Sequence, residues 1–172
     1  MTTVADIFSK IEVHQRSAIE SINGATSDCS RGNKPLYEIG DQLVYLKYYV
    51  ACCFQVEKDA MINFGYLQYE NHRRNHDNVL DDLNDVLKQC TLPESEGTAQ
   101  KSKLLAAVIT VLGRLQEHIA KHNRELIAFL NKQVEQTKLT APVTGAKHQH
   151  VQQELAHLEK YLNKGGRTAA AR

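Results

Sequence analysis

Three predicted helices each carry metal-ligand-type side chains within an otherwise apolar stripe, and this feature most constrains how the chain folds. The sequence HRRNH places His72 and His76 one turn apart on one helix face. Glu57 lies near the end of the preceding helix, and His118 lies on the following one. Because each unpaired buried polar group costs about 1–3 kcal/mol, a core that accepts all four must bring them together. Histidines and carboxylates from facing helices are a recurrent way to build a metal site inside a helical bundle.

The hydrophobic residues follow helical periodicity along most of the chain, and no strand pattern competes. We expect a first helix from Thr2 or Thr3 to about Gly24, a loop over 23–35, and helices over about 36–64, 69–90 and 101–134. Gly65 is the expected C-cap of the second helix. The residues expected on the inward faces are Ile7, Phe8, Ile11, Ala18, Ile19, Ile22, Ile39, Leu43, Leu46, Val50, Cys53, Glu57, Ala60 or Met61, His72, His76, Val79, Leu80, Leu83, Val86, Leu87, Leu104, Ala107, Val108, Val111, Leu115, His118, His122, Leu126 and Phe129.

Long helices joined by short connections pack as antiparallel neighbours. The sequence therefore predicts an all-α fold, an up-and-down antiparallel four-helix bundle over residues 1–137. Residues 138–172 are expected to form a linker, marked by Pro142 and Gly145, then an additional amphipathic C-terminal helix and a basic tail. The apolar stripe of that helix consists of Val151, Leu155, Leu158 and Leu162.

Charge and composition exclude several classes of function. The net charge is +1 and 24% of the residues are charged, so no basic field indicates a nucleic-acid partner. No apolar window approaches the length of a membrane span, and the first residues do not resemble a secretory signal. The four cysteines follow no CxxC spacing, which favours reduced thiols in a cytoplasmic protein. Nucleophile-elbow, P-loop and dinucleotide-binding motifs are missing, so we expect no enzymatic activity.

The stretch FQVEKDAMINFGYLQYENHRRNH, with His118-Ile119 further on, resembles the hemerythrins and especially the bacterial hemerythrin-like domains. In that family HFxxEExLM is followed by GYP and HxxxH, and a later helix carries HIxxxD. The resemblance covers about residues 5–131 and implies the same fold and metal binding. The residues at matching spacing are Glu57, Met61, Gly65, Tyr66, His72, His76, His118 and Ile119.

The sequence departs from the family at three ligands of its di-iron centre. Gln15 stands at the histidine position of the first helix, with His14 beside it, and Cys53 replaces the histidine of HFxxE. Asn123 replaces the aspartate of HIxxxD. Both histidines of one iron are thus missing, and in the family that iron has the open position for dioxygen. The resemblance therefore argues against oxygen carriage by the usual mechanism.

What remains implies a reduced site made of Glu57, His72, His76 and His118. By family implication it holds iron, with zinc as a competitor because histidine and carboxylate suit both. Three histidines and one carboxylate can complete one ion but not two, so we expect one ion rather than two. The implied role is sensing or binding iron or a small gas such as dioxygen or nitric oxide. The alternative is that the site has decayed. The chain is then a metal-free interaction module whose C-terminal helix binds a protein partner or a second copy.

Five further residues have open roles. Cys53 is either a thiolate ligand or a small core residue. His14 and His122 each precede an altered ligand position by one residue, about 100° around a helix, and are either replacement ligands or surface histidines. Gln15 and Asn123 either coordinate weakly through their carbonyl oxygens or form structural hydrogen bonds.

Overall fold

A computed structural model of the protein describes residues 4–90, 98–139 and 153. The helices are α1 (Val4–Ser30), α2 (Leu36–Phe64), α3 (Tyr69–Cys90), α4 (Thr98–His118), the π-helical turn η1 (Ile119–Asn123) and α5 (Arg124–Leu139). The described part of the chain contains no strand. The predicted all-α class is therefore confirmed. The predicted linker, C-terminal helix and basic tail lie outside the described residues, apart from the single residue 153.

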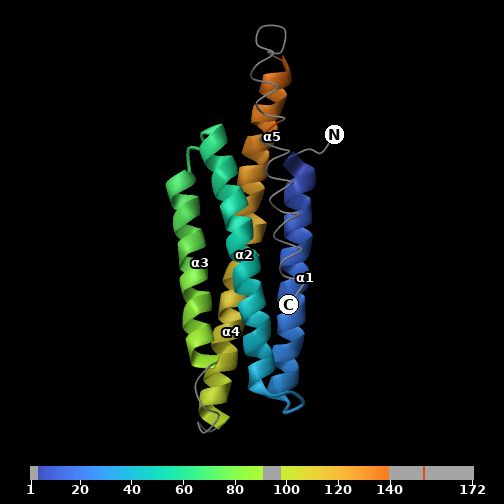
Figure 1. Ribbon diagram of the computed structural model, residues 1–172, viewed down its shortest axis with the longest axis vertical. Coiled ribbons are helices and arrows are strands. Elements are labelled where there is room, and N and C mark those ends of the chain that lie inside the picture. Colours follow the sequence, from blue (N-terminus) through green and yellow to red (C-terminus); the bar gives the residue numbers. More distant parts are fainter. Residues whose placement is uncertain (1–3, 91–97, 140–152, 154–172) are drawn as a thin grey trace.

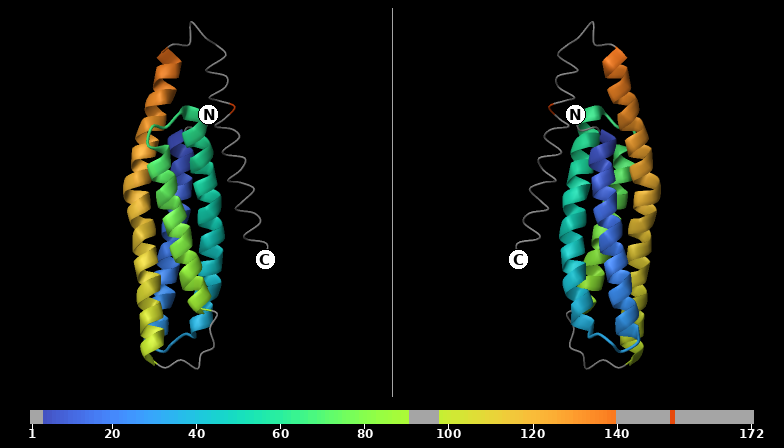
Figure 2. Two further views of the ribbon diagram at one scale, coloured as in Figure 1. Left: turned by 90° about the vertical axis from the view of Figure 1, so that its left-hand side faces the viewer. Right: turned by 90° about the vertical axis from the view of Figure 1, so that its right-hand side faces the viewer.

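The helices lie side by side, and α4, η1 and α5 follow one another without a break as a single long rod (Figures 1 and 2). The colour order in Figure 1 shows that rods adjacent in the sequence run in opposite directions. Contacts join α1 to α2, α2 to α3, α3 to α4, and α4 back to α1. Each rod can therefore turn one face toward a shared core.

The second and third helices have the predicted bounds, and the predicted cap of α2 is confirmed. Gly65 adopts the left-handed conformation with φ 67°. Its N–H donates to the carbonyl oxygen of Ile62, and the N–H of Tyr66 donates to that of Met61. Only glycine adopts this backbone conformation without a steric penalty, so Gly65 ends α2 where the sequence predicts.

The predicted end of the first helix is wrong, because α1 continues six residues past Gly24 to Ser30. Ala25, Thr26 and Cys29 are buried and extend the stripe that Ile22 belongs to. The Thr26 hydroxyl donates to the carbonyl oxygen of Ile22 at 2.7 Å. Burial of this extra turn outweighs the roughly 1 kcal/mol that a glycine costs inside a helix. The chain turns instead just beyond the helix, at Gly32, where φ is 79°.

The core consists of two apolar clusters separated by a layer of buried polar residues. The upper cluster, toward the top of Figure 1, contains Ile7, Phe8, Ile11, Cys53, Val56, Ala60, Met61, Tyr66, Leu126 and Leu130. The lower cluster includes Ile19, Ile22, Leu43, Leu46, Val50, Phe54, Val79, Leu83, Leu115 and Ile119. Every rod contributes to the polar layer between them, which consists of Gln15, Glu57, His72, His76, His118 and Asn123.

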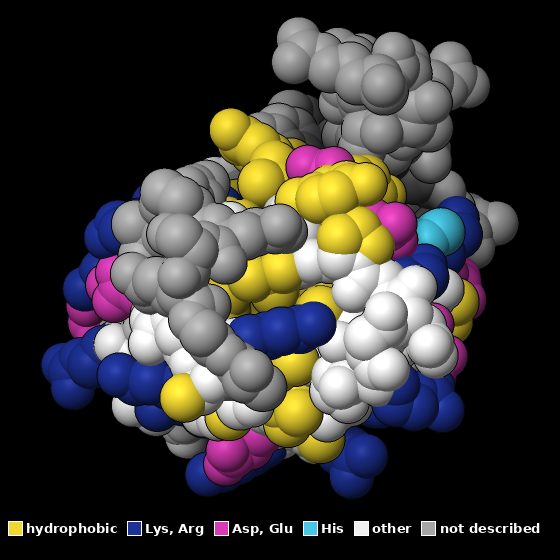
Figure 3. Space-filling model, turned by 90° about the horizontal axis from the view of Figure 1, so that it is seen from below, with side chains coloured by type: hydrophobic (Ala, Val, Ile, Leu, Met, Phe, Trp, Pro, Cys, Tyr) yellow, Lys and Arg dark blue, Asp and Glu magenta, His cyan; other side chains and the backbone are white. Residues whose placement is uncertain are grey.

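The surface carries charges of both signs. Seen from below, basic and acidic side chains alternate around the rim, and hydrophobic side chains show between the helix ends (Figure 3). None of the described helices has an apolar stretch of the length needed to cross a membrane.

Candidate metal centre

Glu57 is the point at which the polar layer converges. Its carboxylate oxygen Oε2 lies 2.8 Å from Nε2 of His76, 3.2 Å from Nε2 of His72 and 3.3 Å from Nε2 of His118. The four ligand atoms all lie within 4.8 Å of one another, and all four residues are buried. The structure thus brings together the four residues that the sequence singled out as metal ligands.

The three histidines cannot all form good hydrogen bonds to the same oxygen of Glu57. A carboxylate oxygen has about two lone pairs, so it cannot accept well from three ring nitrogens at once. Nδ1 of His118 lies 2.9 Å from Oδ1 of Asn75, so it must carry a hydrogen to donate. In the neutral ring, Nε2 of His118 then turns a lone pair toward the negative oxygen of Glu57. A cation placed among the four atoms would turn this repulsion into coordination.

The spacing of the donor atoms suits a small divalent ion. Metal bonds of roughly 2.0–2.1 Å in tetrahedral geometry place neighbouring donor atoms about 3.3 Å apart. The contacts of Glu57 with His72 and His118, at 3.2 and 3.3 Å, are close to this value. Imidazole and carboxylate together are ligands for both iron and zinc. The contact of Glu57 with His76 is shorter, at 2.8 Å, and the four ligand atoms lie within 4.8 Å of one another, so small side-chain adjustments would be needed to complete a tetrahedral site.

Burial and hydrogen bonding oppose each other at Glu57. Burial alone would raise the pKa of this carboxyl, but the surrounding imidazoles hold the pKa well below its usual range. His72 and His76 can do so by donating an N–H to Oε2, whereas His118 can do so only when both of its ring nitrogens carry a hydrogen, because Nδ1 already donates to Asn75. At His76 burial dominates: desolvation lowers the pKa to about 4, although Glu57 acts in the opposite direction. The shared contact therefore favours an ionised Glu57 beside a neutral His76. These are the protonation states that metal binding requires.

Aromatic packing fixes the orientation of two of the histidines. The Phe54 ring is stacked on His76, with centroids 3.8 Å apart and planes 7° from parallel. The same ring meets His118 edge-on at 4.9 Å. Phe54 is one turn before Glu57 on α2 (i, i+3) and belongs to the lower cluster. It therefore holds the rings against the carboxylate and closes that side of the layer with apolar surface.

The π-helical turn η1 shapes the fourth rod beside the site. In an α-helix, residues five apart point about 140° away from each other. With η1 between them, His118 and Asn123 are both buried, with exposed fractions of 1% and 2%. π-Turns of this kind occur frequently at functional sites. Here the turn lets one rod contribute two polar residues to the layer.

This turn also corrects the predicted inward face of the fourth helix. Regular α-helical spacing predicts His122, Leu126 and Phe129 inside. The structure buries Leu126 as predicted, but it also buries Asn123 and Leu130, while His122 and Phe129 are only half-buried. His122 is left half-buried, with its ring 5.5 Å from that of His118 and 5.6 Å from that of His72.

The other side of the polar layer is chemically different. Gln15 is completely buried, and both its amide atoms lack a hydrogen-bond partner among the described residues. Oδ1 of Asn123, Oε1 of Glu57 and Nδ1 of His72 share this condition. Buried polar atoms without partners are rare in folded proteins, and each calls for an explanation. Two of these five atoms belong to the candidate ligands and three to neutral amides.

Cys53 lies in the upper cluster and is fully buried. Burial, and then the negative charge of Glu57, raise the pKa of its thiol far above the usual range, and its side chain hydrogen-bonds to Tyr49. Coordination needs the thiolate, and burial and the charge of Glu57 both disfavour that form of Cys53. The geometry and charge around Cys53 thus favour the core-residue interpretation over the ligand interpretation.

His14 is exposed and lies outside the polar layer. Its ring meets Tyr49 edge-on at 6.1 Å in a groove between α1 and α2. The sequence placed Gln15, not His14, at the inward position, and this is confirmed.

Asn75 and Phe54 contact the candidate ligands, and sequence reasoning did not single them out. Asn75 lies beside His76 within HRRNH, but its neighbour is His118, forty-three residues further on. A polar hollow of about 440 Å³ between α3 and α4 is lined by both Asn75 and His118. No spacing rule within α3 predicts this contact, whereas the apolar stripe around Phe54 was a usable signal.

Comparisons of the chain with protein-family models, with curated proteins and with solved structures find no match.

Proposed function

We propose that this protein binds one metal ion through Glu57, His72, His76 and His118. The observation that supports this most is the convergence of three imidazole nitrogens on one carboxylate oxygen, at 2.8–3.3 Å, in a fully buried layer. Without an ion these groups compete for the same oxygen. With an ion, each donor atom gains a partner, and the unfavourable burial of four polar groups is offset.

The sequence resemblance suggests the type of protein. We propose a hemerythrin-like, up-and-down four-helix bundle with an additional C-terminal helix, and iron as the ion, with zinc competing for the same donors. Its role would be to sense or bind iron or a small gas such as dioxygen or nitric oxide. Gln15 and Cys53 occupy the positions that match the oxygen-binding iron of the family. For that reason we expect no reversible dioxygen carriage by the family's mechanism.

An enzymatic role is not part of this proposal. Cys53, in the upper cluster beside the polar layer, is not an activated nucleophile, since burial raises the pKa of its thiol and disfavours the thiolate. The cysteines of the described chain, Cys29, Cys52, Cys53 and Cys90, are all free thiols. They fit the cytoplasmic location that we propose.

Elemental analysis of the purified chain, reconstituted with ferrous iron and separately with zinc, tests the proposal. We expect about one ion per chain, because three histidines and one carboxylate complete one coordination sphere and not two. Two ions per chain would show that the side of the layer formed by Gln15 and Asn123 also supplies ligands. A chain that takes up neither metal would favour the metal-free interaction module.

A further inference from the structure

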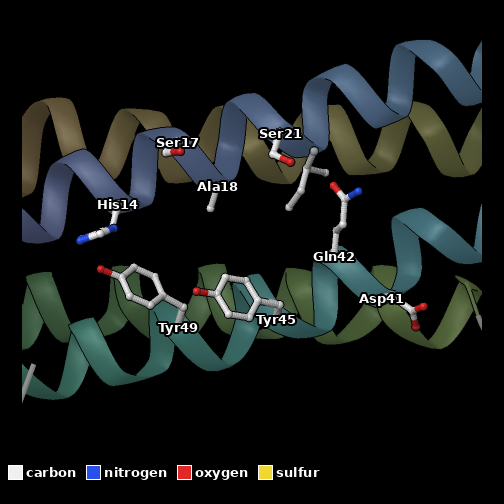
Figure 4. Close-up of a pocket in the computed structure, with 9 residues that line it drawn as sticks. His14, Ser17, Ala18, Ser21, Asp41, Gln42, Tyr45 and Tyr49 are labelled. Carbon is white, nitrogen blue, oxygen red and sulfur yellow. The ribbon is translucent and has the colours of Figure 1, made fainter. Parts of the chain in front are cut away.

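A groove runs between α1 and α2 on the surface of the bundle. α1 lines it with the small side chains Ser17, Ala18 and Ser21, and α2 lines it with Tyr45 and Tyr49, which face them across the gap (Figure 4). Because the α1 side chains are small, they leave a hollow of about 390 Å³. The groove is thus a place where the two helices do not fill the space between them.

The margins of this groove expose apolar surface. Tyr45 is 46% exposed, and Tyr48, one turn further along α2, is 65% exposed. On α1, Val13 is 61% exposed and lies one turn before Ser17. In the groove itself, Oε1 of Gln42 is buried without a hydrogen-bond partner among the described residues. Exposed apolar side chains that surround a hollow mark a contact surface.

We propose that this groove is the docking site of the chain's own segment 147–164. The first argument is the place where the described chain ends. α5 finishes at Leu139, at the end of the bundle where α1 begins (Figure 1), and α1 and α5 are in contact. Seven residues, 140–146, separate this point from the segment, a reach of about 23 Å. The segment therefore starts within reach of the first turns of α1.

The second argument is length. As a helix, residues 147–164 would extend about 27 Å, and the stripe from Val151 to Leu162 about 17 Å. The groove lies some ten to eighteen residues into α1, about 15–27 Å from its start. A helix that enters beside the start of α1 and runs along it therefore brings Leu158 and Leu162 over the groove, with Val151 and Leu155 between the groove and the start of α1.

The third argument is the tether. A second copy of the chain would compete poorly, because a short tether holds the chain's own segment at an effective concentration near millimolar.

Site-specific photo-crosslinking tests this without disturbing the fold. A benzoylphenylalanine probe at position 48 replaces an exposed tyrosine at the margin of the groove. We expect it to crosslink to the peptide 147–164 of the same chain, as shown by mass spectrometry of mixed light and heavy isotope-labelled protein. Crosslinks between chains would identify a second copy as the occupant and overturn the proposal. Crosslinks to no part of 147–164 would also overturn it.

Limited proteolysis supplies a second, independent measurement. Tyr45→Asp and Leu158→Asp should each speed tryptic cleavage after Lys160 and Lys164 at least tenfold, and the double variant should add nothing further. Ile109→Asp is the matched control, since Ile109 is 56% exposed on α4 and outside the groove. Equal cleavage rates in the Tyr45→Asp variant and the control would show that the segment docks elsewhere. Circular dichroism on each variant confirms that the bundle remains folded.

Discussion

The two sides of the polar layer are equally buried but differ in what they can bind. On one side His72, His76 and His118 point at a single carboxylate oxygen. On the other side Gln15 and Asn123 present neutral amides, and two of the neighbouring positions are the protonated thiol of Cys53 and the aliphatic Ile11. Imidazole and carboxylate gain strongly from a cation, whereas amides gain little. Burial alone therefore does not make a metal site, because the charge and lone-pair geometry of the buried groups decide it.

The largest expected difference between the two sides is in metal affinity. His76→Ala should weaken binding of zinc or ferrous iron by more than about 100-fold, since it removes a ligand rather than a supporting group. His14→Ala should change affinity by less than about twofold, because His14 is exposed and outside the layer. Competition against a chromogenic chelator measures both. Equal losses in the two variants would contradict the assignment of inward faces on α1.

Acid should destabilise the metal-free protein because His76 is harder to protonate in the folded protein than in the unfolded chain. The folded-state pKa of His76 is about 4, below the ordinary value of 6.5. Above pH 6.5 His76 is neutral in both the folded and the unfolded protein. As the pH falls from 6.5 through 4, His76 takes up a proton more readily in the unfolded chain than in the folded one. Stability should therefore fall over this window by an amount on the order of 3 kcal/mol. The lowered pKa of Glu57 extends the loss below pH 4.5.

Denaturant unfolding at a series of pH values, with chelator present, checks this expectation. His76→Gln should flatten the profile between pH 6.5 and 4, because its amide does not titrate. A profile that falls equally in the His76→Gln variant would place the acid sensitivity in another group.

Asn75 should orient His118 for metal binding, although Asn75 is not itself a candidate ligand. Its Oδ1 accepts from Nδ1 of His118, which directs the lone pair of Nε2 toward the site. Asn75→Ala should lower metal affinity about 10- to 100-fold, the usual cost of losing such a partner. Asn75→Asp should restore it, since a carboxylate also accepts from Nδ1–H. Nitrogen chemical shifts of His118 in the metal-free protein report the tautomer directly, and a mixed tautomer in wild type would contradict this role.

The smallest expected effect is on the amide side. Gln15→Met conserves volume and removes two buried amide atoms that lack partners among the described residues. It should raise the free energy of unfolding by about 1 kcal/mol and leave the metal content unchanged. Thermal unfolding together with elemental analysis decides both points. A loss of metal in this variant would show that Gln15 is a ligand and that the two sides of the layer act together.

The regular elements follow closely from local sequence. Helix α2 has the predicted bounds because its apolar stripe is continuous and Gly65 supplies a left-handed cap. The four candidate ligands were predictable because polar residues interrupt apolar stripes on three helices. Side-chain direction repeats with the helical period, so a one-dimensional pattern is enough to assign an inward face.

Packing between helices decided where α1 ends and where the π-turn η1 forms. Gly24 alone predicts an end to α1, but burial of Ala25, Thr26 and Cys29 against the lower cluster carries the helix on to Ser30. The π-turn after His118 accompanies the burial of two polar residues five apart, His118 and Asn123. These outcomes depend on free energies gained between distant segments, which local periodicity does not encode.

The same division holds at the site. The sequence by itself determined which side chains of α2 and α3 face the core, and that Glu57, His72, His76 and His118 are side chains of the type that iron and zinc bind. Only the tertiary structure decided that three imidazoles meet at one oxygen of Glu57, and that Asn75 supports His118 across forty-three residues. The physical reason is that the helical period sets direction to within tens of degrees, whereas distances near 3 Å depend on how neighbouring helices are rotated and packed.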